Sequence, residues 1–76
     1  MENFPRITHD PAVMARRATI RGMRVTVGMI VNHLAAGCTQ EALLADYPYL
    51  EAEDIQQALA YAAWRVEERE FDLRAA

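Results

Sequence analysis

Four arginines lie close together near the N-terminus of this 76-residue chain: Arg16, Arg17, Arg21 and Arg24. A guanidinium group can form paired hydrogen bonds with a phosphate or a carboxylate. An arm or two-stranded ribbon that carries such groups can place them against a DNA groove or backbone. The same arginines could instead pair with the acidic half of another subunit. Both interpretations remain open from the sequence.

Two amides extend this set of candidate DNA-binding residues. Gln56 and Gln57 lie in the longest predicted helix, and a glutamine amide can pair with the edge of adenine. However, Glu51, Glu53 and Asp54 occupy the first turn of the same helix and would place carboxylates against phosphates. Acids in a first turn more often complement the helix dipole than bind a cation. The pattern therefore disfavours standard reading of DNA by this helix.

The charge is divided between the two halves of the chain. Residues 1–38 carry a balance of +3 and residues 39–76 a balance of −6, which gives the net charge of −3. Such asymmetry indicates separate partners or attraction between subunits.

Candidate catalytic and metal-binding residues are sparse. His9, His33 and Cys38 do not have metal-ligand spacing, and no nucleophile, base and orienting group can be assigned together. We expect no enzyme activity, no metal and no cofactor. Cys38 is interpreted as a small apolar residue that precedes a helix, and His33 as a polar residue on an exposed helix face.

Short strands and three helices would position these residues. Phe4 to Asp10 and Ala18 to Val25 are candidate strands, and Gly22 marks a bulge or bend in the second. Helical periodicity predicts a ten-residue helix from Val27, a second helix over residues 39–47 and a third over residues 51–69. The predicted N-caps are Thr26, Thr39 and Glu51, and Gly37 is predicted to be a left-handed C-cap.

Aromatic residues of the third helix indicate a second apolar side. The predicted buried stripe consists of Ile55, Ala58, Leu59, Ala62 and Val66. Trp64 lies about 200° around the helix from both Ala62 and Val66, so it cannot share that stripe. We expect Trp64, with Tyr61 and Phe71, to form a protein interface outside the subunit core. The alternative is that the N-terminal strands fold back over Trp64.

Length and composition define the class of protein. The chain is short and more than half hydrophobic, which predicts one small, mostly α-helical domain and favours a homodimer. We divide it into a strand-containing arm (residues 1–25), a three-helix core (26–70) and a tail (71–76). No apolar run is long enough for a membrane span, and the N-terminus is unlike a signal peptide, so we expect a cytoplasmic protein without membrane contact.

Several motifs occur in a characteristic order: RITHDP from Arg6, IRGMR from Ile20, Gly37, YPYL from Tyr47 and ALAYA from Ala58. In this order and spacing the chain resembles domain-of-unknown-function family 433, a group of small homeodomain-like proteins that includes VapB-type antitoxins. The chain departs from that family where Ala15-Arg16-Arg17-Ala18 replaces a Gly-Gly-Lys-Pro segment, and where Met23 replaces a threonine.

The resemblance implies a three-helix, helix-turn-helix fold and an accessory protein that binds DNA or neutralises a toxin. The leading functional hypothesis is an antitoxin-like dimer that binds a toxin protein and double-stranded operator DNA. The alternative is an interaction or dimerisation module without a DNA role.

Overall fold

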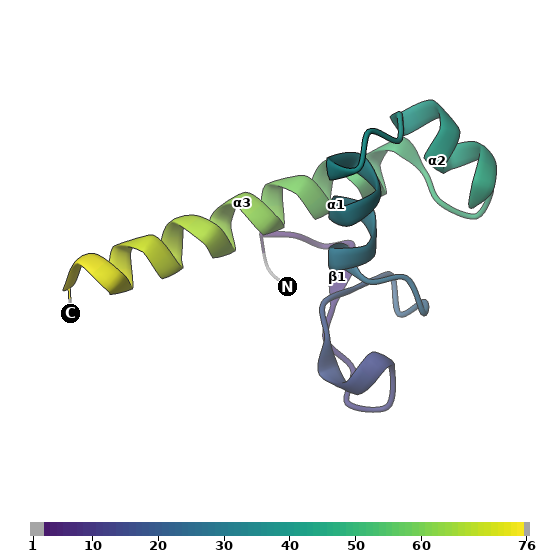
Figure 1. Cartoon of the computed structure of the whole chain (residues 1–76). Coiled ribbons are helices and arrows are strands. Elements are labelled where there is room, and N and C mark those ends of the chain that lie inside the picture. The colour runs from purple at the N-terminus through teal and green to yellow at the C-terminus, as the bar shows by residue number, and fades with distance from the viewer. Residues whose placement is uncertain (1–2, 76) are drawn as a thin grey trace.

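The computed structural model describes residues 3–75, with side chains for residues 3–68. In chain order the elements are strand β1 (Ile7–Thr8), a one-turn helix η1 (Met14–Arg16), strand β2 (Thr19–Ile20) and helices α1 (Val27–Ala35), α2 (Gln40–Asp46) and α3 (Ala52–Ala75). This arrangement confirms the predicted mostly α-helical fold with three helices after two short strands. Figure 1 shows that α3 extends well beyond the body formed by the other elements.

The two strands form a small antiparallel sheet in which Ile7 pairs with Ile20 and Thr8 with Thr19. Both isoleucines are fully buried, so they fix the register of this short ladder. After β2 the chain reverses in a tight turn, where the Met23 N–H donates to the Ile20 carbonyl at 2.8 Å. Arg21 and Gly22 at its centre have φ values of 47° and 73°, as a type I′ turn requires. Gly22 therefore marks a turn, and each strand is shorter than predicted.

The helix boundaries follow the predicted caps. The hydroxyls of Thr26 and Thr39 accept hydrogen bonds from Met29 N–H and Ala42 N–H, at 3.0 and 3.1 Å. Gly37 has a φ of 98°, and the N–H groups of Gly37 and Cys38 donate to the carbonyls of Leu34 and His33. This pair of bonds is a Schellman motif, so the predicted left-handed C-cap of α1 is confirmed.

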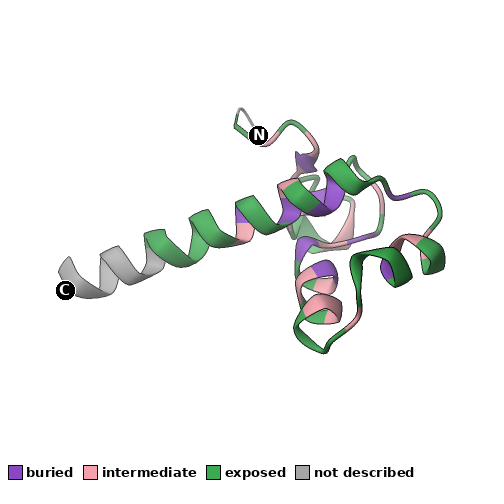
Figure 2. Ribbon diagram, turned by 90° about the horizontal axis from the view of Figure 1, so that it is seen from above, coloured by how far each residue is buried: buried purple, intermediate pink, exposed green. Residues whose placement is uncertain are grey.

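The core lies where the sheet, α1 and α2 meet the first half of α3. Its largest fully buried side chains are aliphatic: Ile7, Ile20, Ile30, Leu43 and Ile55. Figure 2 shows buried positions on α3 only where it passes the body, while its later turns are exposed or not described. Within residues 3–75, no helix combines the length and apolar character that crossing a membrane requires.

The buried stripe of α3 differs from the predicted one. Ile55 and Ala58 are fully buried as expected, but Leu59 and Val66 are 42% and 55% exposed. Tyr61 is only 8% exposed and belongs to the core, so the expectation that it lies outside is wrong. The reason is that the N-terminal arm and α1 both pack on α3. The contact with the arm buries the side of the helix that carries Tyr61. The helix also continues to Ala75, through residues expected to form a tail.

Candidate functional site

A buried carboxylate organises the polar contacts of the molecule. The Asp54 side chain is fully buried at the start of α3 and accepts four hydrogen bonds. Arg21 donates through Nε at 3.1 Å and Nη2 at 2.8 Å, Arg6 donates through Nη1 at 2.9 Å, and the Glu51 N–H donates at 2.8 Å. The last of these bonds is one half of a capping box, in which Asp54 at the third helical position accepts from the N–H of Glu51, the predicted N-cap. We call Arg6, Arg21, Glu51 and Asp54 the Asp54 cluster.

The turn and the first strand deliver the two arginines to Asp54. Arg21 sits in the left-handed region at the tip of its turn, and its Nη2 also donates to the Tyr49 carbonyl at 2.9 Å. Arg6 directly precedes β1, and its guanidinium also pairs with the Glu51 carboxylate. The Arg6 N–H donates to the Gln57 side-chain oxygen at 2.9 Å. The cluster therefore fastens the N-terminal arm to the beginning of α3.

The charges within this cluster stabilise one another. Burial alone raises the pKa of Asp54, but the hydrogen bonds from Arg21, Arg6 and the Glu51 N–H outweigh that effect and hold the pKa below its ordinary value. The hydrogen bonds that Arg6 donates to Glu51 and Asp54 raise the pKa of Arg6, and those that Arg21 donates to Asp54 raise the pKa of Arg21. All three groups therefore stay charged at neutral pH.

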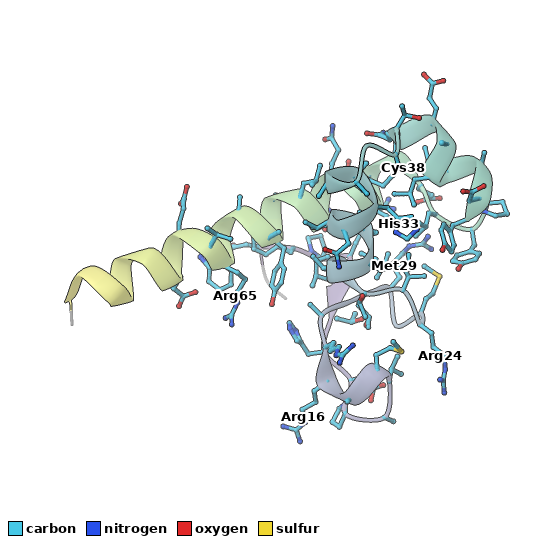
Figure 3. The ribbon with its side chains drawn as sticks, viewed as in Figure 1. Arg16, Arg24, Met29, His33, Cys38 and Arg65 are labelled. Atoms are coloured by element: carbon cyan, nitrogen blue, oxygen red, sulfur yellow. The ribbon has the colours of Figure 1, made fainter. Side chains whose placement is uncertain are left out.

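The cluster separates the predicted DNA-binding residues into two groups. Arg21 and Gln57 are engaged within the chain, and the Gln57 amide also donates to Glu53 at 3.2 Å. Gln56 is exposed on α3. Arg16, Arg17 and Arg24 are exposed, and no described residue forms an ion pair with them. Figure 3 shows that Arg16 and Arg24 project from the same end of the molecule, away from α3.

The loop that carries Arg16 has an unusual backbone. Met14, Ala15 and Arg16 all have positive φ values, between 50° and 68°, and form a single left-handed turn. A left-handed conformation costs residues with a Cβ atom roughly 1–2 kcal/mol each. This is the segment in which the resembling family has glycines. The residues that replace the glycines in this chain are therefore strained in this turn.

Aromatic side chains join the N-terminal arm to the middle of α3. Phe4 packs edge-on against Tyr61 with ring centres 5.6 Å apart, and its ring centre lies 6.0 Å from that of Trp64. The Tyr61 hydroxyl lies 3.2 Å from the Nε2 atom of His9. Trp64 still exposes 41% of its surface, so the arm covers it only in part. The side chain of Phe71, the third predicted interface residue, lies outside the described residues.

An open groove of about 630 Å³ lies beside this aromatic group. Its lining includes Arg17, Val27, Gly28, Met29, His33 and Tyr61. Arg17 is the only Arg, Lys, Asp or Glu residue in its lining. The His33 ring is half-buried, because its Nδ1 lies 2.9 Å from the Met29 carbonyl and its ring packs edge-on against Tyr47. His33 is therefore less exposed than the sequence predicted.

The described residues contain no group of three or more His, Cys, Asp or Glu side chains that could hold a metal ion. Cys38 is half-buried and packs against the core at the position predicted for it before α2. His9, His33 and Cys38 thus have separate packing environments.

The sequence alone did not reveal the role of Asp54. Its position in a first helical turn predicts only a local role at the start of the helix, and Arg21 is predicted to contact DNA or the acidic half of another subunit. Arg21 and Arg6 lie 33 and 48 residues away from Asp54 in the chain, and no local sequence pattern predicts such a pairing. The only signal in the sequence for the placement of Arg21 is the glycine that follows it, Gly22, which is suited to a tight turn.

The fold and this cluster define a class of small helical domain in which a two-stranded arm is fastened to the last helix through a buried carboxylate. Residues 7–62 match the family described as protein of unknown function (DUF433), and the chain belongs to that family.

A solved structure supports this assignment. The chain is similar to a DUF433 member protein from Anabaena variabilis, with 32% sequence identity and a TM-score of 0.77. The similarity covers 91% of this chain and 68% of that one. Comparison with curated proteins gives no significant match.

Proposed function

We propose that this member of DUF433 is an antitoxin-like protein that binds and neutralises a cognate toxin protein through the Trp64 side of α3. The observation that carries the proposal is the 41% exposure of Trp64 on a helix that extends beyond the body of the domain. Tryptophan is enriched among the residues that dominate binding energy at protein interfaces. The proposal assigns no catalytic residue.

The surroundings of Trp64 suit a protein partner. Phe4 and Tyr61 support its ring from one side, so the indole is held in place before a partner binds. The Arg65 guanidinium lies 6.0 Å from the ring centre and supplies a polar edge. A helix that presents a supported aromatic residue is suited to docking into a groove of another protein. Preorganisation of this kind lowers the entropic cost of association.

The test uses the product of the neighbouring gene as the candidate toxin. Both proteins are co-expressed, and growth rescue and the dissociation constant of the purified pair are measured. We expect Trp64→Ser to weaken binding by about 30-fold, the effect of losing about 2 kcal/mol at an interface hot spot. Tyr49→Ser is the matched control, because Tyr49 is 51% exposed but lies before α3.

Circular dichroism must show that both variants keep their helices. Equal rescue and equal affinity for Trp64→Ser and the wild type would refute the assignment of this surface. A neighbouring gene product that neither inhibits growth nor binds the chain would contradict the antitoxin proposal itself.

A second candidate activity is DNA binding by the N-terminal arm. It is favoured by the three exposed arginines, Arg16, Arg17 and Arg24, that have no ion-pair partner among residues 3–68. In this arrangement Arg21 acts indirectly, by holding the turn in place through Asp54. The arm would contact phosphates through these three guanidinium groups.

Titration of double-stranded DNA at 50 and 200 mM salt tests this activity. Three phosphate contacts per protomer predict a slope of log affinity against log salt of about −2.7, and Arg24→Ala should reduce its magnitude by about one. Arg65→Ala, on α3, is the control and should leave the slope unchanged. An absence of binding at 50 mM would remove the DNA activity and leave an interaction module.

A further inference from the structure

The groove beside α1 has a composition that calls for a particular kind of occupant. Its wall is formed largely by apolar groups of Val27, Met29 and Tyr61. Gly28 is exposed on the first turn of α1, where the absence of a side chain permits the close approach of another backbone. Arg17 at the edge is exposed and without an ion-pair partner among the described residues. A fitting occupant is therefore apolar with a negative charge at one side.

One exposed side of α3 has this composition. At 100° per residue, Leu59, Ala63, Val66 and Glu67 fall within about 100° of one another around the helix. All four are exposed, and Leu59 and Val66 expose 42% and 55% of their surfaces. We call these four residues the outer face of α3. Trp64 lies about 140° from Leu59 and about 60° from Glu67 around the helix, so the outer face lies next to the surface proposed to bind a toxin but does not include Trp64.

We infer that the outer face of α3 in one copy of this chain docks into the groove of a second copy, with Glu67 beside Arg17. This inference goes beyond the proposed function, and it names a contact for the homodimer that the sequence favours. Both surfaces are present in every copy, and they are complementary. The apolar residues of the outer face would meet the apolar wall of the groove, and the Glu67 carboxylate would meet the Arg17 guanidinium. A flexible methionine in the groove wall adapts readily to an incoming helix.

Other occupants fit the groove less well. A nucleic-acid backbone would place many phosphates against a surface that has one arginine among mostly apolar groups. A small anion would leave the apolar wall of the groove exposed. Two turns of helix bury less area than the roughly 1,200–2,000 Å² of a standard stable complex. We therefore expect association in the micromolar range, reported by the average mass in sedimentation as protein concentration rises.

Charge reversal on each surface tests the contact. Arg17→Glu damages only the groove and Glu67→Arg damages only the outer face, and each should weaken self-association at least about fivefold. An equimolar mixture of the two variants should associate more strongly than either alone. In the mixture, the intact Arg17 of one variant meets the intact Glu67 of the other.

Two further substitutions are controls for this experiment. Arg24→Glu reverses an exposed charge outside the groove and should leave association unchanged. Val66→Glu should weaken association more than tenfold, whereas Ala45→Glu, at an exposed site on α2, should not.

The inference is overturned if the wild type stays monomeric at 0.5 mM. It is also overturned if Arg17→Glu associates like the wild type, or if the mixture shows no recovery. Toxin affinity of Arg17→Glu is measured in parallel, because this variant keeps the Trp64 side intact. Retained toxin binding with lost self-association would support both assignments. If the wild type does not bind the toxin, the proposed function is wrong. The contact between copies is then decided by the sedimentation results alone.

Discussion

Replacing Asp54 with asparagine should be among the most destabilising single changes in this protein. The substitution keeps the size of the side chain but removes the charge that two arginines share. Removal of one member of a fully buried ion pair costs about 3–5 kcal/mol. The Arg6 and Arg21 side chains are 29% and 38% exposed, and solvent can partly rehydrate them. We therefore expect a loss of about 2–3 kcal/mol.

That loss is large for a chain of this length. At about 0.05–0.15 kcal/mol per residue, a 76-residue domain has a free energy of unfolding of roughly 4–11 kcal/mol. Urea denaturation followed by circular dichroism at pH 7 measures the change. Glu53→Gln is the matched control, because Glu53 is exposed in the same helical turn and should change stability by less than about 0.5 kcal/mol.

The pH dependence provides a second test of the same residue. The pKa of Asp54 is lowered in the folded state, so the unfolded chain binds this proton first as the pH falls. The stabilisation is therefore complete above the ordinary carboxyl pKa of about 3.9 and is lost below it. The wild type should lose stability between pH 5 and pH 3 more steeply than Asp54→Asn. A loss below 1 kcal/mol at pH 7, or parallel pH curves, would refute the reasoning.

Four other substitutions test separate features. Gly37→Ala should lower stability by about 1 kcal/mol because of its φ of 98°, whereas Gly28→Ala inside α1 should raise it by about 0.5–1 kcal/mol; equal melting temperatures would contradict this. Ala15→Gly should raise stability by about 1 kcal/mol by relieving a left-handed alanine, and a decrease would argue against that backbone. Phe4→Ala should shift the fluorescence of Trp64, the single tryptophan, to longer wavelength, and an unchanged spectrum would show that Phe4 does not shield it.

Local chemistry made the helix boundaries predictable. The hydroxyls of Thr26 and Thr39 accept hydrogen bonds from backbone N–H groups that have no partner within the helix, and Gly37 adopts a positive φ without a steric cost. These signals act over three or four residues, so they can be read along the chain. The same holds for the apolar positions Ile30 and Ile55, which are buried as helical periodicity requires.

Long-range packing decided what the sequence left open. The side of α3 that is buried depends on which elements cover the helix. Phe4 and His9 of the arm contact Tyr61, although they are more than 50 residues away from it in the chain. Leu59 is exposed as a result, although its spacing from Ile55 suits a buried position. For the same reason the local sequence around Arg21 identifies a positively charged residue but not its partner. The carboxylate of Asp54 meets Arg21 only in the folded protein.

The Asp54 cluster also bears on the order in which the chain folds. Arg6 and Asp54 are separated by 48 positions, so their meeting closes a loop of most of the chain. Loop closure over that distance costs more entropy than the contacts within and between neighbouring helices. The arm should therefore dock after the helices have assembled. In stopped-flow experiments Arg6→Ala is then expected to accelerate unfolding and leave the refolding rate nearly unchanged, whereas slower refolding would place arm docking in the transition state.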